Sequence, residues 1–222
     1  MLSKWVGGVK PPLQPVRLLD EPGANTMGST KEPTIGILAV QGDFAMHAKM
    51  LERIGAKYKF VKHVGDFQDI DALILPGGET TTMLKFLAER KIGDAIKKFA
   101  AEDKPVFGTC AGAILMAKEV LNPEQERLGL IDISIERNAY GRQVDSSVQQ
   151  GECPELSGRP IEMVFIRAPI IRRVGEGVKI LGRTGELPVL VEQGNLLAAT
   201  FHPELTTDET IHRYFLKNAT QS

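Results

Sequence analysis

The first half of this chain alternates short apolar runs with stretches of helical spacing, and this alternation limits the folds open to it. Residues 34–40 (TIGILAV), 72–76 (ALILP) and 105–110 (PVFGTC) are runs of the kind that form buried parallel strands. Between them, residues 41–56 and a stretch from about residue 81 to 99 carry apolar side chains near helical spacing. Such alternation is typical of βαβ units. We therefore predict an α/β fold with three layers, in which an open, mostly parallel sheet has helices on both faces.

The second half of the chain is richer in strand-like runs. Five of them follow one another between residues 133 and 201, with turn residues between most of them. The last run, 196–201, is expected to return to the central sheet, and the others indicate an antiparallel flank. Helices are also predicted at residues 111–121 and 207–218. The segment 137–159 is rich in Gly, Ser, Gln and Pro, and we predict a long functional loop there.

Composition and charge exclude several classes of protein. Basic and acidic side chains nearly balance, at 27 and 28, which argues against a nucleic-acid-binding protein. No apolar run approaches the roughly 20 residues that a membrane helix needs, so no membrane segment is expected. Two cysteines are too few for a disulfide framework or a four-cysteine zinc site, and a cytoplasmic location is expected. Residues 1–32 lack a sustained period and are predicted to be a disordered leader or extension, followed by one domain at 33–222.

The strongest local signal is the sequence Gly108-Thr109-Cys110-Ala111-Gly112, between an apolar strand and an apolar helix. A nucleophile at a sharp strand-to-helix turn needs small neighbours, because the backbone is strained and the helix packs close to the strand. A helix N-terminus stabilises the thiolate that attacks, and the Ala111 N–H points to where an oxyanion would form. This pattern predicts a nucleophilic cysteine, with a buried cysteine in a tight turn as the alternative.

A second signal is the sequence Phe201-His202-Pro203-Glu204, directly after the apolar run. A cysteine nucleophile needs a base, and the base needs a group that orients it. In an extended stretch His202 and Glu204 would face the same side, so that Glu204 holds one ring nitrogen while the other faces the thiol. We interpret the other three histidines as incidental surface or core residues: His47, His63 and His212.

A third signal is the glycine pair Gly77-Gly78, which ends the predicted strand at residues 72–76. Paired glycines let backbone N–H groups approach a ligand, and ligands bind at the carboxyl ends of strands in open α/β sheets. A phosphate cradle would need a following lysine, which is missing here. This motif is weak alone and gains weight beside the other two.

In this order, the motifs LPGGE, GTCAG and FHPE resemble those of class I, triad-type glutamine amidotransferases. The longer strings resemble the family of glutaminase subunits of pyridoxal 5′-phosphate synthase, over roughly residues 34–218. Those strings are LPGGETTTM, FGTCAGAILMAKE, IERNAYGRQVDS, FIRAP and FHPELTTD.

The resemblance implies a role for each matching residue. It makes Cys110 the nucleophile, with His202 and Glu204 completing a catalytic triad, and the Gly78 N–H a second oxyanion donor beside that of Ala111. Gln41 matches a residue near the oxyanion hole, on the face that meets the synthase subunit. The remaining matches would bind glutamine: Gly78, Glu79, Thr80, Arg137, Ile166 and Arg167. We interpret Cys153 as an incidental thiol.

The implied activity is hydrolysis of L-glutamine to glutamate and ammonia through a γ-glutamyl thioester, with no metal and no organic cofactor. The ammonia would pass to a separate barrel-shaped synthase subunit, in a hetero-oligomeric complex that makes pyridoxal 5′-phosphate. Three alternatives are a glutaminase subunit of another pathway such as histidine biosynthesis, a non-catalytic glutamine-binding module, and a cysteine peptidase. The strings IERNAYGRQVDS and FHPELT argue against the first, and the complete Cys, His and Glu set argues against the second.

Overall fold

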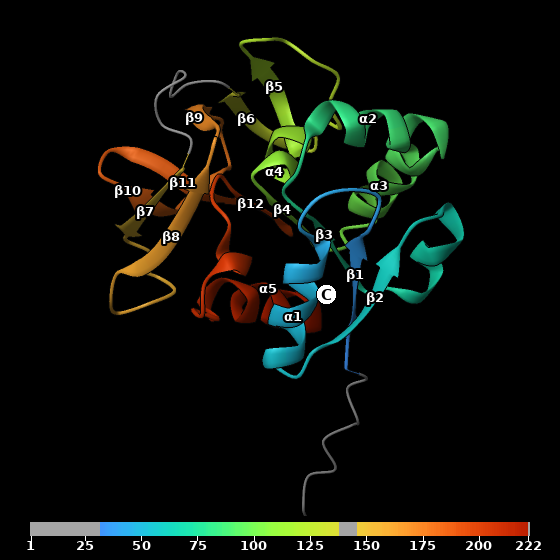
Figure 1. Cartoon of the computed structure of the whole chain (residues 1–222), viewed down its shortest axis with the longest axis horizontal. Helices are drawn as coiled ribbons and strands as arrows, with labels where there is room; N and C mark the ends of the chain where they lie inside the picture. The colour runs from blue at the N-terminus through green and yellow to red at the C-terminus, as the bar shows by residue number, and fades with distance from the viewer. Residues whose placement is uncertain (1–31, 138–145, 222) are drawn as a thin grey trace, which may run out of the picture. The chain divides into compact units, whose positions relative to one another are not determined.

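The computed structural model describes residues 32–137 and 146–221, and a seven-stranded sheet is its largest element (Figure 1). Five neighbouring strands of this sheet pair in parallel, and the strands at one edge, β10 and β11, join it through antiparallel pairings. In spatial order the strands are β10 (Lys179–Thr184), β11 (Leu187–Gln193), β12 (Leu196–Ala199), β4 (Val106–Thr109), β3 (Ala72–Leu75), β1 (Thr34–Leu38) and β2 (Lys57–Val61).

Helices cover both faces of this sheet, which confirms the predicted three layers. On β3, Leu73 and Leu75 face a core built with the helices α2 (Thr80–Glu89), α3 (Ile92–Ala101) and α4 (Ala111–Met116). Ile74, between them, faces the opposite core, which is built with α1 (Phe44–Arg53) and α5 (Thr210–Gln221). This alternation follows from the period of two along a strand, which turns successive side chains to opposite faces. All four residues of β3 are buried, as a central strand requires.

Two smaller sheets account for the rest of the predicted antiparallel flank. One contains β5 (Ala117–Leu121), β6 (Ile131–Glu136) and β9 (Ile170–Val174), and the other is the hairpin of β7 (Ser146–Gly151) and β8 (Ile161–Ile166). β12 does return to the central sheet, where it pairs in parallel with β4. The flank is therefore divided, because β10 and β11 extend the central sheet while β6 and β8 pair elsewhere.

Two predicted helices were too long. The single helix expected from about residue 81 to 99 is two helices, α2 and α3, separated at Lys91, whose φ of 55° is left-handed. This turn lets the buried side chains of both helices reach the same core. The helix expected at 111–121 ends at Met116, because the carbonyls of Leu115 and Met116 accept hydrogen bonds from Leu128 and Leu130. The residues that follow form β5 instead.

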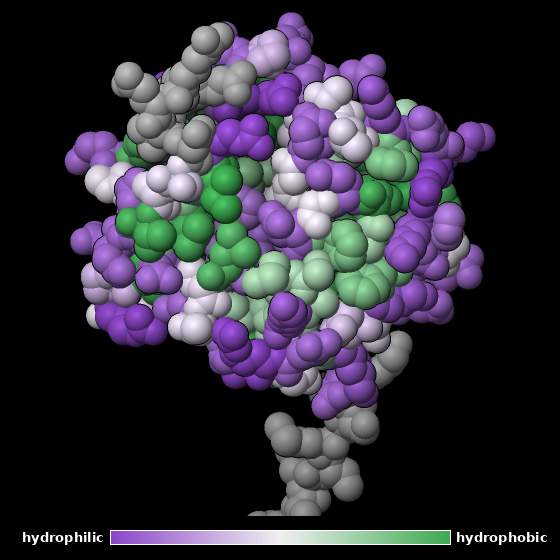
Figure 2. Space-filling view, in the orientation of Figure 1, coloured by the Kyte–Doolittle hydropathy of each residue, from purple (hydrophilic) through white to green (hydrophobic). Residues whose placement is uncertain are grey.

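The predicted loop at 137–159 contains the strand β7, whose polar sequence gave no strand signal. Residues 138–145 of that loop and residues 1–31 of the predicted leader lie outside the described residues. Within the described ranges, no helix is both long and apolar enough to cross a membrane. Figure 2 shows apolar surface in two areas of one face, over the β7–β8 hairpin and beside β2, with polar side chains around them. Among the described residues, the large exposed apolar side chains are Phe60 of β2, Val64 shortly after it, Val148 of β7 and Ile166 of β8.

Candidate active site

Cys110 lies at the sharp turn between the end of β4 and the start of α4. Its backbone has φ of 46° and ψ of −102°, which is a strained conformation for a residue with a side chain. The helix packs so close to the sheet that a Cβ atom on Gly112 would lie 2.0 Å from the carbonyl oxygen of Leu75. The small residues around Cys110 are therefore required by the turn. Its thiol is largely buried, and Sγ lies 3.9 Å from the carbonyl oxygen of Ile166.

The structure brings His202 and Glu204 together beside this turn. The Nδ1 atom of His202 lies 2.7 Å from Oε1 of Glu204, and both side chains are buried. An ionised carboxylate only accepts hydrogen bonds, so Nδ1 carries the proton and Nε2 is left for the thiol. The extended stretch expected here was wrong in detail, because Pro203–Leu205 forms a short 3-10 turn, η3. The His202 N–H donates to the carbonyl of Val164 in β8, which fixes the start of that turn.

The electrostatics of the pair favour a charged histidine. Burial opposes the imidazolium, but hydrogen bonds with Cys110 and Glu204 outweigh it and raise the pKa of His202 to about 10. Burial raises the pKa of Glu204, and its hydrogen bond with His202 acts in the opposite direction. A histidine that is protonated at neutral pH stabilises a neighbouring thiolate, which is the reactive form of a cysteine.

The glycine pair Gly77-Gly78, at the end of β3, lies beside the His202 ring. A Cβ atom on Gly77 would lie 2.4 Å from Cε1 of His202, so only glycine fits beside the histidine ring. The side chain of Gln41 holds the loop from the other side, because its Oε1 accepts a hydrogen bond from the Glu79 N–H at 2.9 Å. The Asp43 N–H donates to the Gly77 carbonyl at 3.1 Å. The loop is thus held next to His202 by the segment that follows β1.

The two polar side chains of the predicted glutamine loop are occupied by contacts within the protein. The Glu79 carboxylate caps α2 by accepting hydrogen bonds from the N–H groups of Thr81 and Thr82, and the Thr82 hydroxyl lowers its pKa most, to about 2. The hydroxyl of Thr80 donates to Oε1 of Gln125 at 3.0 Å. A role for either side chain in binding glutamine stays a prediction.

Of the other predicted pocket residues, only Ile166 has a described contact with Cys110. Arg167 is exposed at the end of β8 and has a left-handed φ of 43°, next to the Ile166 carbonyl that faces Cys110. Arg137 is the last residue before the segment that lies outside the description, and its N–H donates to the Leu121 carbonyl. The structure therefore places Ile166 beside the thiol, and the roles of both arginines stay predictions.

A model of the SNO glutamine amidotransferase family matches residues 37–221, which is most of the chain. The chain belongs to this family. This confirms the resemblance drawn from the motifs around Cys110 and His202.

Relatives of this SNO-family chain support the same assignment. Proteins named pyridoxal 5′-phosphate synthase subunit PdxT are 54% identical to it in Solibacter usitatus and 51% identical in Thermus thermophilus, each over 187 residues. These alignments cover 82% and 83% of this chain and 97% of each relative. A crystal structure of a glutamine amidotransferase is 50% identical, with a TM-score of 0.79 over 83% of this chain and 98% of that one. The structure of PurLQS from Thermotoga maritima, at 18% identity and a TM-score of 0.61 over 86% of this chain and 97% of that one, shows the shared fold alone.

Two histidines of this SNO-family chain lie behind the predicted triad, and the sequence did not place them there. Nε2 of His47 lies 3.5 Å from Oε2 of Glu204 and 3.1 Å from the Thr109 hydroxyl. Nδ1 of His47 lies 3.0 Å from Nε2 of His212. The interpretation of these two histidines as incidental was incomplete, because His47 contacts Glu204. Its place on the buried face of α1 was the available signal, since a buried polar group needs partners.

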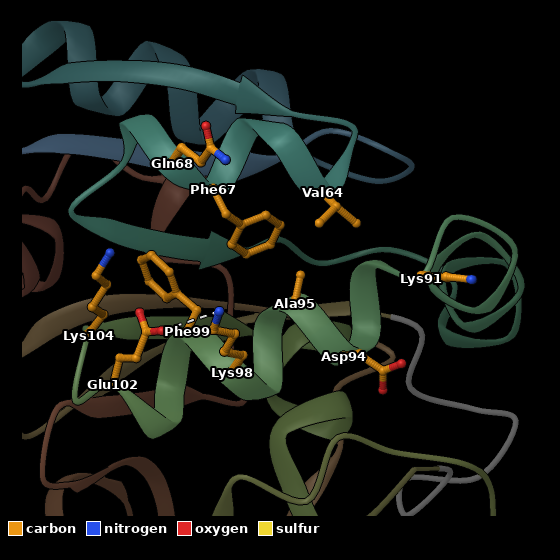
Figure 3. Close-up of a pocket in the computed structure, with 10 residues that line it drawn as sticks. All are labelled: Val64, Phe67, Gln68, Lys91, Asp94, Ala95, Lys98, Phe99, Glu102 and Lys104. Carbon is orange, nitrogen blue, oxygen red and sulfur yellow. Dashed lines mark ion pairs between the residues drawn. The ribbon is translucent and has the colours of Figure 1, made fainter.

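A separate cavity of about 530 Å³ lies between η1 (Val64–Asp69) and α3 (Figure 3). Phe67 and Phe99 form its apolar wall in an edge-to-face contact, and Lys98 and Lys104 lie at its edge. None of the residues that line this cavity belongs to the predicted site.

Asp43, His202 and Glu204 each offer an atom of a type that can bind a metal ion, and these three atoms lie within 4.8 Å of one another. Two of these atoms are the pair joined by the 2.7 Å hydrogen bond, with Asp43 Oδ2 3.7 Å from Nδ1 of His202. This arrangement suits an oriented base rather than a cation, since a protonated Nδ1 cannot ligate a metal.

Proposed function

We propose that the chain hydrolyses the side-chain amide of L-glutamine, with Cys110 as nucleophile and His202 as general acid and base. The Cys110 thiolate attacks the amide carbon, and the N–H groups of Gly78 and Ala111 stabilise the oxyanion. His202 then gives its proton to the departing nitrogen, which leaves as ammonia while a γ-glutamyl thioester remains on Cys110. Water, deprotonated by His202, attacks the thioester and releases glutamate.

The contact between His202 and Glu204 is the observation that carries this proposal. A buried carboxylate 2.7 Å from Nδ1 fixes the ring and its tautomer, as the orienting acid of a triad does. The raised pKa keeps His202 protonated at neutral pH, so that the ring can give the leaving nitrogen the proton it needs. Cys110 alone, as a strained cysteine in a tight turn, would not distinguish a nucleophile from a structural residue. Membership of the glutamine amidotransferase family supports the amide of glutamine as the substrate.

The ammonia formed here is proposed to serve a pyridoxal 5′-phosphate synthase. The relatives at 54% and 51% identity are named as subunits of that synthase, which supports a partner that consumes ammonia in vitamin B6 biosynthesis. We place Gln41 on the partner's side of the site, as the family resemblance implies, and its hydrogen bond from the Glu79 N–H puts it beside the glycine loop. A hetero-oligomeric complex, a barrel-shaped partner and a cytoplasmic location complete the proposal. The proposed chemistry needs no cofactor.

Release of glutamate from glutamine, measured with and without the purified synthase partner, tests this function. We expect the synthase to stimulate release, and we expect Cys110→Ala to abolish it. Cys153→Ala is the matched control, because Cys153 is buried in the opposite part of the core from α4 and should keep full activity. Glutamate release by Cys110→Ala in the presence of synthase would overturn the mechanism. Stimulation by a histidine-pathway cyclase instead would overturn the partner.

A further inference from the structure

A chain of buried polar groups connects Glu204 to α5 through α1. Oε1 of Glu204 holds His202, and its other oxygen, Oε2, lies 3.5 Å from Nε2 of His47. Oε2 is buried and has no hydrogen-bond partner among the described residues, and its ion-pair contact is with His47. Beyond His47, the row of buried polar groups continues to His212, whose Nδ1 has no hydrogen-bond partner among the described residues.

Burial favours the neutral form of both histidines in this row of buried polar groups, His47 and His212. Burial lowers the pKa of His47 well below its ordinary value, and the nearby His212 and His202 lower it further. Burial lowers the pKa of His212 to about 3. A neutral imidazole has one N–H donor and one acceptor nitrogen, so the order of protons along the chain is a choice between two arrangements.

The contacts at the two ends select one arrangement. If His47 carries its proton on Nδ1, its Nε2 accepts from the Thr109 hydroxyl with the Glu204 carboxylate 3.5 Å away, and His212 is left with a buried N–H that has no acceptor among the described residues. If His47 carries its proton on Nε2, that N–H has two acceptors on its side of the ring, the Thr109 hydroxyl at 3.1 Å and Oε2 of Glu204 at 3.5 Å, and Nδ1 accepts from the N–H of His212. The group left unpaired is then an acceptor on His212, which costs less than an orphaned N–H.

We propose that His47, protonated on Nε2, is a positioning residue that donates a hydrogen bond to the second oxygen of Glu204 and so holds His202 against Cys110. This inference rests on the function proposed above and adds a residue to the same site. At 3.5 Å the two atoms are farther apart than in an ordinary N–H···O hydrogen bond, so the proposal requires this contact to shorten in the working enzyme. Catalytic hydrogen bonds are often long in unliganded structures and tighten when substrate binds.

The consequence for Cys110 follows from the charges. A donor at Oε2 stabilises the Glu204 carboxylate, the carboxylate stabilises the His202 imidazolium, and the imidazolium stabilises the thiolate. Loss of the donor therefore leaves less thiolate at a given pH. The charged and titratable groups that face Glu204 are His202 on its own turn, His47 of α1 and Asp43 before α1, and His212 of α5 faces His47.

Two substitutions at His47 separate this role from simple packing. His47→Leu removes the donor, whereas in His47→Gln the side-chain NH₂ reaches about as far as Nε2 and restores it. The first readout is the pH dependence of Cys110 alkylation by iodoacetamide, with peptide mass mapping to separate Cys110 from Cys153. The second is glutamate release with the synthase present. Leu51→Ala is the control, because it removes a buried side chain of α1 without touching this polar chain.

We expect His47→Leu to shift the alkylation profile to higher pH and to lower kcat about 10- to 100-fold at unchanged KM. His47→Gln should recover most of both effects. Leu51→Ala should lower Tm without moving the alkylation profile. A wild-type profile in His47→Leu, or no recovery in a His47→Gln variant that folds normally, would overturn the inference. Wild-type protein that releases no glutamate with synthase refutes the proposed function instead, and the alkylation profiles still decide the role of His47.

Discussion

Replacing Gly112 by alanine tests the strand-to-helix turn that positions Cys110. The new Cβ atom would lie 2.0 Å from the carbonyl oxygen of Leu75 and 3.0 Å from the Leu75 Cβ. The oxygen belongs to the backbone of the central sheet, so α4 has to retreat by about 1 Å to reach even a tight contact. Every residue of α4 is buried, which means that this shift disturbs packing on all sides.

Overpacking of this kind costs about 1–3 kcal/mol, which corresponds to a Tm lower by about 2–12 °C in a chain of this size. A displacement of about 1 Å at Cys110 should also lower the rate of glutamate release about a hundredfold. Thermal unfolding and a glutaminase assay measure the two effects. Gly65→Ala is the control, because its Cβ would meet nothing within 4 Å, and it should change neither. A Gly112→Ala protein as stable and active as Gly65→Ala would refute the reasoning.

Three further predictions follow from other contacts. Glu79→Gln should lower Tm at neutral pH, because the ionised carboxylate stabilises the fold. The difference from wild type should shrink as the pH falls below 4.5 and vanish only below about pH 2, the pKa of the folded carboxyl; a constant difference would contradict this. Burial raises the pKa of Cys153 to about 11, so iodoacetamide at pH 7 should modify Cys110 and spare Cys153, as peptide mapping would show. Phe107→Ala should cost about 3–5 kcal/mol in denaturant unfolding, since the side chain is fully buried; a loss below about 1 kcal/mol would argue against this core.

The elements that the sequence predicts well are those in which local pattern and tertiary contact agree. β3 and β4 are short apolar runs that lie in the middle of the sheet, so their burial is visible in their composition. β7 has the sequence SSVQQG and forms a strand only because it pairs with β8 across six positions. The break at Lys91 also depends on tertiary contacts, since both helices around it have helical periodicity.

The same distinction holds for the site. Cys110, His202 and Glu204 were predicted because small flanking residues and a two-residue spacing are local features. His47 was not, because its contact with Glu204 joins residues 157 positions apart in the sequence, through the packing of α1 against η3. The hydrogen bonds that the Glu79 carboxylate accepts at the start of α2 are local, and an acidic residue directly before a helix was a usable signal for them.

A glutamine analogue that carries a diazoketone in place of the side-chain amide tests the central claim most directly. Such a compound alkylates the nucleophile that would otherwise attack the amide, so peptide mass mapping identifies that residue. The account predicts one label, on Cys110, with loss of glutamate release in proportion to labelling and protection by glutamine. A label on any other residue, or full glutamate release by protein labelled at Cys110, would contradict it.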